Sequence, residues 1–370
     1  MPEGIHIVSF DVPFPPDYGG VIDVYFKAKA LSKEGLKVIL HCFQYGRPSS
    51  KKFESDFFKV IYYKRKVAPS ALLARSPFIV KTRKNEELLT NLQSNEWPIL
   101  FEGLHTCAWL DAPRLKDRIK LVRTHNVEHD YYAKLAASED NVFRKRYFKT
   151  EAKKLARFEK ILNHANHILT LSQHDQKYFE KGFDSVQLFY PFHFETELPQ
   201  RKKSKYAFYH GKLEVTENKQ AVQFLIDQVF DDLDLNLVVA GKGSWEDIVD
   251  LQASNSKVEF YLNPSEEEMA NLASRSAVHV LPTFQDTGFK LKLLYSLQSD
   301  APIVVNPEMV KGTGLSELVI LAKDPEEFKK KITMATRQPL SDSDLDKRRK
   351  TLLLDYSNQS QAQNIMQLLS

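Results

Sequence analysis

Cysteine, long apolar runs and an excess of one charge are all scarce in this chain of 370 residues. Its two cysteines, Cys42 and Cys107, cannot form a disulfide framework, and no nearby ligands complete a zinc-type quartet. No apolar run approaches the roughly 20 residues that cross a bilayer. The N-terminus lacks the basic and apolar regions of a signal peptide. These absences predict a cytoplasmic protein with buried, reduced thiols.

The charge balance argues against nucleic acid as the partner. Lys and Arg total 52 against 48 Asp and Glu, which leaves a net charge of only +4, whereas nucleic-acid-binding domains are usually more basic. A hydrophobic content of 42% excludes a disordered chain. At roughly 100–200 residues per domain, the length predicts two domains.

Short apolar runs alternate with longer amphipathic stretches along the whole chain. This alternation predicts βαβ units, and therefore an α/β protein with two mostly parallel, Rossmann-like sheets. The expected strands are residues 5–10, 38–43, 99–102, 119–124, 167–171, 206–209, 235–240, 258–261, 277–281, 302–305 and 318–321.

The stretch 186–205 breaks this rhythm with two prolines and a basic run, and it predicts an interdomain linker. We therefore expect domains at 1–195 and 196–355, with a terminal helix at 356–370 that has one apolar face. Ligands of open α/β sheets bind beyond the carboxyl ends of the strands. Two such domains are expected to face one central cleft.

In the first domain, two loops that follow strands are candidates for ligand binding or catalysis. The pair Gly19-Gly20 precedes a helix and would let backbone N–H groups approach an anion, although a tight turn explains it equally well. His125, Glu128 and His129 match a zinc-protease pattern. Because His125 directly follows a strand, we expect it to lie outside the helix, as a single imidazole facing the cleft or hydrogen-bonded within its loop.

In the second domain, lysines follow the strands. Gly211 and Lys212 form a plausible phosphate contact, with Asn218 as a possible helix cap. Lys290 and Lys292 would occupy the first turn of a helix, where cations oppose the helix dipole. This arrangement predicts an anion at the same helix end.

A cationic amphipathic helix is expected over residues 143–160. Its basic side chains are either a solvated face or a contact to a membrane surface or lipid-linked acceptor. The glycines after residue 240 lack the third glycine of a dinucleotide fingerprint, and the chain has neither a phosphate-binding P-loop nor a nucleophile elbow.

In their order and spacing these loops resemble the GT-B glycosyltransferases, specifically retaining enzymes of the family-4 type, over nearly the whole chain. The matching segments are Pro13–Gly20, Arg123–Glu128, Glu159 with Ile168–Ser172, Gly211-Lys212 and Gly288–Lys292, and the final helix resembles the one that crosses back onto the first domain.

The resemblance implies that a sugar is transferred from a nucleotide-sugar donor to a glycan or lipid-linked acceptor, with retention and without a metal or other cofactor. Such a hexosyltransferase of surface-polysaccharide synthesis would be cytoplasmic or peripheral to the inner face of the membrane. The resemblance assigns catalytic roles to His125, Lys290 and Lys212. It assigns donor binding to Gly19, Gly20, Gly211, Leu262, Asp286, Thr287, Gly288, Phe289, Lys292 and Tyr295.

One departure leaves other functions open. Where the family carries a Glu-x7-Glu motif, this chain has Thr287 and Tyr295, with Asp286 displaced by one position. A degenerate member that binds sugar or nucleotide without transfer is therefore an alternative. A zinc hydrolase using His125, or an epimerase using Glu102 and Asp286, are further alternatives.

Overall fold

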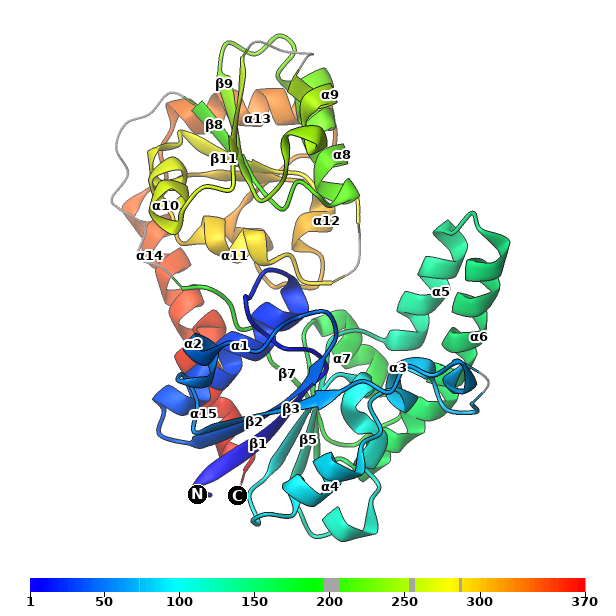
Figure 1. Cartoon of the computed structure of the whole chain (residues 1–370). Coiled ribbons are helices and arrows are strands. Elements are labelled where there is room, and N and C mark those ends of the chain that lie inside the picture. The colour runs from blue at the N-terminus through cyan, green and yellow to red at the C-terminus, as the bar shows by residue number, and fades with distance from the viewer. Residues whose placement is uncertain (73, 196–205, 253–256, 286–287, 370) are drawn as a thin grey trace. The chain divides into compact units, whose positions relative to one another are not determined.

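The computed structural model describes residues 1–72, 74–195, 206–252, 257–285 and 288–369. The chain divides into two compact units, one of Met1–His193 with Asp355–Ser370 and one of Phe194–Leu354. Each unit is a parallel sheet with helices between its strands (Figure 1). None of the helices within the described residues is long and apolar enough to cross a membrane.

Unit 1 contains a seven-stranded sheet in the order β3-β2-β1-β4-β5-β6-β7, with every pairing parallel. Its central strand β1 is buried at every position, as expected for a parallel strand covered on both faces. The strands are β1 Gly4–Ser9, β2 Lys37–Gln44, β3 Lys59–Lys64, β4 Ile99–Glu102, β5 Lys120–Thr124, β6 His167–Thr170 and β7 Val186–Leu188.

Helices connect the strands of unit 1, and the C-terminal helix of the chain packs in the same unit. The apolar residues Ala362, Ile365 and Met366 of that helix are buried in the same core cluster as residues of β1 and the first helix. The terminal helix therefore belongs to the first unit. The helices are α1 Gly19–Lys33, α2 Lys51–Glu54, α3 Phe78–Lys81, α4 Glu86–Leu92, α5 Glu128–Ser138, α6 Val142–Phe158, α7 Gln173–Phe179 and α15 Asn358–Gln367.

Unit 2 contains a six-stranded parallel sheet in the order β10-β9-β8-β11-β12-β13. Its strands are β8 Tyr206–His210, β9 Asn236–Gly241, β10 Val258–Leu262, β11 Val278–Leu281, β12 Ile303–Val305 and β13 Ile320–Leu321. Its helices are α8 Thr216–Phe224, α9 Val249–Gln252, α10 Glu266–Arg275, α11 Leu291–Leu297, α12 Pro307–Val310, α13 Pro325–Arg337 and α14 Asp342–Thr351.

Two strands were not predicted, and both lie at the edges of the first sheet. β3 is only partly buried over most of its length, and β7 has three half-buried residues within the stretch read as a linker. An edge strand is exposed on one side, so its sequence carries less of the continuous apolar signal of a central strand. The linker prediction was therefore wrong at its beginning.

The chain order reverses once in each sheet, between β1 and β4 in unit 1 and between β8 and β11 in unit 2. At such a switch point the loops after neighbouring strands turn to opposite faces and leave a crevice beyond the carboxyl ends. The loops that follow these four strands are thus where each unit offers a ligand site.

Close backbone approach at the second switch point predicts that Gly241→Ala destabilises unit 2. A Cβ at Gly241 would lie 1.8 Å from the carbonyl oxygen of Gly211, and backbone cannot move aside cheaply. We expect the free energy of unfolding to fall by about 2 kcal/mol or more, measured by urea unfolding. Gly182→Ala, where a Cβ meets nothing within 4 Å, is the control. Equal effects of the two substitutions would contradict the packing argument.

Candidate functional site

At the switch point of unit 1, an imidazole lies against a carboxylate. Glu102 ends β4, and His125 follows β5 before α5 begins at Glu128, so His125 lies outside the helix as predicted. His125 Nε2 is 3.0 Å from Glu102 Oε2, and its ring meets that of Phe10 edge-on at 5.3 Å between centroids. Because a carboxylate accepts the Nε2 hydrogen, a neutral His125 presents Nδ1 as an acceptor.

Glu102 belongs to a buried cluster of four charges. Lys27 Nζ lies 2.9 Å from Glu102 and 2.7 Å from Asp23, and Arg123 Nη2 lies 2.9 Å from the other oxygen of Asp23. None of the four side chains is more than 1% exposed. Burial alone would raise the pKa of Asp23, but Arg123 and Lys27 hold it well below its usual range.

Three ligand atoms of this cluster, from Asp23, Glu102 and His125, lie within 4.8 Å of one another. This spacing would suit a metal ion, but the ammonium of Lys27 already lies against both carboxylates. A divalent cation would have to displace that buried charge. The group therefore does not fit a metal, and its chemistry is that of an ion-pair cluster.

A second imidazole lies on the same edge of the sheet. His105, in the connection after β4, has its ring 5.6 Å from Phe10 and its Nδ1 3.8 Å from the carboxylate of Glu128. Burial raises the pKa of Glu128 to about 8, which Arg83 opposes and Asp175 and Glu159 reinforce. His105 was not predicted from the sequence, although its place after a strand was a usable signal.

The glycine pair begins α1 next to these rings. A Cβ at Gly20 would approach Phe10 Cζ to 2.9 Å, whereas one at Gly19 would meet nothing within 4 Å. Gly20 therefore lets Phe10 occupy its place beside the imidazoles. Gly19 leaves the helix end open at the switch point, as an approach of anions to backbone N–H groups would require.

The zinc pattern does not assemble. His129 lies 3.3 Å from Glu159 and 3.4 Å from Tyr178 OH, whereas His125 contacts Glu102. Among the described residues, His125, Glu128 and His129 do not form a group of candidate metal ligands. The five-residue match is therefore a coincidence of sequence.

At the switch point of unit 2, two predicted lysines are paired with acids. Lys290 Nζ lies 3.7 Å from Glu217, whose carboxylate also accepts a hydrogen bond from Thr283 Oγ1. Lys212 Nζ lies 3.1 Å from Glu214. The anion expected near Lys290 is thus present within the chain.

Lys292 is held by neutral groups. Its Nζ donates to Asn218 Oδ1 at 2.9 Å and to Tyr209 OH at 3.2 Å. Burial lowers the pKa of Lys292 to about 8, although Glu217 opposes the shift. This is a lysine whose charge is poorly compensated inside the protein, as is typical of a site that receives an anion.

Two details of this region differ from the prediction. Asn218 lies inside α8, which begins at Thr216, and its side chain donates to Lys212 O instead of capping the helix. α11 begins at Leu291 and not at Gly288, so Lys290 is the N-cap residue and makes no side-chain cap. Gly288 has a φ of +72°, which is not a right-handed helical conformation, so α11 begins after it.

Four of the remaining predicted donor residues follow or end strands at the same carboxyl edge. Gly211 follows β8, Leu262 ends β10, and Gly288 with φ of +72° precedes Phe289. Asp286 and Thr287 are outside the described residues. Tyr295, which stands where the family has a carboxylate, packs its ring 5.0 Å from His210.

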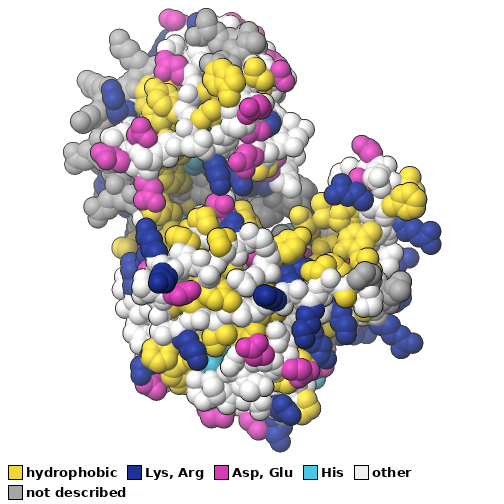
Figure 2. Space-filling view, in the orientation of Figure 1, with side chains coloured by type: hydrophobic (Ala, Val, Ile, Leu, Met, Phe, Trp, Pro, Cys, Tyr) yellow, Lys and Arg dark blue, Asp and Glu magenta, His cyan; other side chains and the backbone are white. Residues whose placement is uncertain are grey.

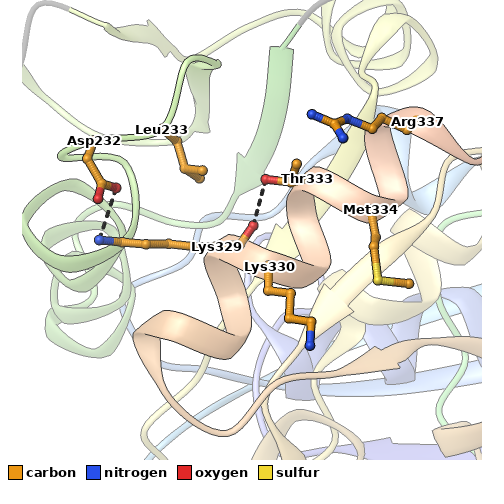
Figure 3. A pocket seen from close by; sticks show the side chains of 7 residues that line it. All are labelled: Asp232, Leu233, Lys329, Lys330, Thr333, Met334 and Arg337. Carbon is orange, nitrogen blue, oxygen red and sulfur yellow. Dashed lines mark hydrogen bonds and ion pairs between the residues drawn. The ribbon is translucent and has the colours of Figure 1, made fainter.

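Two cavities lie elsewhere in the chain. One of about 430 Å³ is lined by α13 and by residues just before β9, at the amino end of that strand. Its cations do not converge, because Lys329 turns to Asp232 while Lys330 and Arg337 point apart (Figure 3). Another, of about 290 Å³, lies before β5 and β6 in unit 1. Neither adjoins a switch point.

Comparison with known proteins supports the architecture. HepE of Anabaena in complex with UDP and glucose matches with a TM-score of 0.66 at 12% identity, over 100% of this chain and 99% of that one. A glycosyltransferase of Rickettsia africae matches equally well over 100% and 98%, and MurG of Acinetobacter baumannii reaches 0.54 over 100% and 99%. The fold is that of the GT-B glycosyltransferases.

No protein-family model matches the chain. A relative in sequence is an uncharacterized 44.6 kDa protein in the cps region of Klebsiella pneumoniae, which is 24% identical over 354 residues and 89% of each chain. At this identity the solved structures establish the two Rossmann-like sheets and leave the chemistry to be argued from the residues.

The buried charge cluster predicts a large loss of stability for Arg123→Met. The substitution removes one partner of a buried ion pair and the donor to the carbonyls of Phe189 and Tyr190. We expect the free energy of unfolding to fall by about 3–5 kcal/mol in urea denaturation. Arg144→Met is the matched control, because its pair with Glu139 is exposed and 3.7 Å long, and a loss of at most about 0.5 kcal/mol is expected there. Similar losses in both variants would contradict the cluster's role.

The raised pKa of Glu128 predicts a pH dependence of stability. Between about pH 4.5 and pH 8 the unfolded chain ionises Glu128 while the folded chain keeps it protonated. Stability should therefore fall as the pH rises through this window, by up to a few kcal/mol, and level off above it. Glu128→Gln should flatten this slope when urea midpoints are measured across the range. An unchanged slope would show that Glu128 is ionised in the folded protein.

Proposed function

We propose that this protein is a glycosyltransferase that moves a hexose from a nucleotide-sugar donor to a glycan or lipid-linked acceptor, with retention and without a metal. The observation that carries the proposal is the placement of its reactive side chains. An imidazole at the switch point of one Rossmann-like sheet, and lysines at the switch point of the other, supply the two halves of such a reaction.

Unit 2 would bind the donor. A nucleoside diphosphate leaves with negative charge, and without a metal this charge must be met by cations and backbone N–H groups. Lys290, Lys212 and Lys292 lie at the correct edge for this role. In binding, Lys290 exchanges Glu217 for the phosphate oxygens, and Lys292 gains the counter-charge that Asn218 and Tyr209 do not provide.

Unit 1 would bind the transferred sugar. With Nε2–H directed at Glu102, His125 offers Nδ1 as an acceptor for a sugar hydroxyl. Glu102 positions the ring and does not itself reach the sugar, since it is fully buried. HepE of Anabaena, of the same fold, was solved with UDP and glucose, and the Klebsiella pneumoniae relative lies in a cps region. The first supports a nucleotide-sugar donor, and the second supports an acceptor in surface-polysaccharide synthesis.

A binder without transferase activity is the second candidate. Tyr295 fills the place of the family's second carboxylate and packs on His210. A phenol is uncharged near neutral pH, and burial raises the pKa of Tyr295 further, to about 12. Ribose hydroxyls would thus lose a strong acceptor. Glu217, a carboxylate of α8 at the same switch point, is already bonded to Thr283 and Lys290.

Thermal-shift titration with UDP, GDP and ADP, without and with Mg²⁺, tests the donor site. A ligand that binds only the folded state raises the melting temperature. At a hundredfold excess over Kd it adds about 2.7 kcal/mol to the free energy of unfolding. We expect one nucleotide to stabilise the protein equally with and without Mg²⁺. Lys290→Ala should weaken this stabilisation and lower sugar transfer from the matching donor by about 10²-fold, with little change in the melting temperature of the free protein.

Lys330→Ala is the control. Lys330 is exposed on α13 and lines the cavity at the amino end of β9, not the carboxyl edge where the switch point lies. Nucleotide stabilisation without transfer to any glycan or lipid-linked acceptor would favour the binder. No stabilisation by any nucleotide would overturn the donor site, and a requirement for Mg²⁺ would overturn the metal-independent mechanism.

A further inference from the structure

Helices α5 and α6 form a hairpin that extends from the sheet of unit 1 (Figure 1). Asn141 caps α6, its side chain accepting hydrogen bonds from the N–H groups of Phe143 and Arg144. The turn between the helices is therefore a defined structure, and it fixes which side chains the free end presents.

One face of α6 is a row of cations. Arg146, Lys149, Lys153 and Arg157 are all exposed and recur at intervals of three or four residues, which places them on one side of the helix. None of them forms an ion pair with a described residue. Figure 2 shows Lys and Arg side chains gathered on the outer side of the hairpin.

Exposed apolar side chains stand at the end of this row. Phe143 is 85% exposed and Val142 is 73% exposed, in the first turn of α6. Phe143 lies three residues before Arg146 and so continues the cationic face. An aromatic side chain this exposed contributes nothing to the core. Its position at the start of the basic row indicates a partner that carries negative charge and also has an apolar interior.

The acids of the hairpin do not neutralise the row. Glu151 is buried, pairs with Lys154 and accepts the N–H of Phe78. Glu139 pairs weakly with Arg144 at the turn, where Asp140 is also exposed. The charge on the outer face of α6 is thus positive along its length.

We propose that this face of α6 binds an anionic lipid bilayer, with Val142 and Phe143 inserted among the lipids and the basic row lying on the headgroups. A soluble polyanion would be met by the cations alone and would leave Phe143 in water. A bilayer matches both features, since interfacial helices combine buried apolar side chains with attraction to anionic headgroups. The proposal is independent of the sugar-transfer reaction, although it would bring the protein to the surface that holds a lipid-linked acceptor.

Vesicle co-sedimentation of the full chain tests this surface. The vesicles are phosphatidylcholine alone and an equimolar mixture of phosphatidylcholine with phosphatidylglycerol. The triple variant Arg146→Gln, Lys149→Gln, Lys153→Gln should lower partitioning onto anionic vesicles by about tenfold or more, since each cation near the surface contributes. Phe143→Ser should lower it also, most visibly at high salt, where screening leaves the apolar contribution. The matched control is Lys181→Gln, Lys330→Gln, Lys350→Gln, which removes equal charge from exposed positions elsewhere.

All substituted side chains are exposed, so the melting temperature should stay unchanged and report folding directly. Absence of binding to anionic vesicles by the wild-type chain overturns the proposal. Equal losses of vesicle partitioning in the test and control triple variants also overturn it, because the attraction to the vesicles would then depend on the net charge of the protein and not on this face. Loss in the basic triple with full retention in Phe143→Ser, together with competition by dextran sulfate, would reassign the face to a soluble polyanion.

Discussion

Four charged side chains with no access to water fix the geometry of unit 1. Asp23 and Lys27 come from α1, Glu102 from the end of β4 and Arg123 from β5, and each must lie against an opposite charge because an unpaired ion in the interior is very unfavourable. Asp23 also accepts the backbone N–H of Phe192 at 2.8 Å. The charge cluster thereby joins α1, the carboxyl ends of β4 and β5, and the backbone at Phe192. The imidazole of His125 is held against Glu102 of this cluster.

The sequence analysis located the reactive loops but not the partners that set their chemistry. His125 could be predicted because a polar residue directly after a buried strand must lie at the carboxyl edge of the sheet. Glu102 was noted only as a candidate acid, and its pairing with Lys27 spans 75 residues, which no local pattern encodes. Lys27 was not among the predicted site residues. On an amphipathic helix a lysine is expected to face solvent, yet its side chain is wholly buried because two acids receive it.

In unit 2 a correct physical argument led to an incomplete conclusion. Lysines at a helix N-terminus oppose the dipole and require a negative partner, and the sequence analysis assigned that partner to a ligand. The structure instead provides Glu217, which lies 73 positions before Lys290 and reaches it from α8. The helix begins at Leu291 and not near Gly288, which leaves Lys290 at the N-cap position, 3.7 Å from Glu217. The local sequence thus indicates that Lys290 needs a negative partner, but it does not indicate which residue or ligand provides it.

The two switch points therefore differ in what a ligand can change. In unit 1 the carboxylate behind His125 is fully buried and bound by Lys27, so no incoming group can replace it, and the imidazole keeps one orientation. In unit 2 the pair of Lys290 and Glu217 is 11% and 20% exposed and 3.7 Å apart, which leaves each partner partly solvated and weakly coupled. Under the proposed function, a phosphate would take the place of Glu217 at modest cost, and that acid would return to Lys290 when the phosphate leaves. Such a division, with one fixed group and one exchangeable pair, suits a protein that must hold an orientation on one side and bind and release a charged ligand on the other.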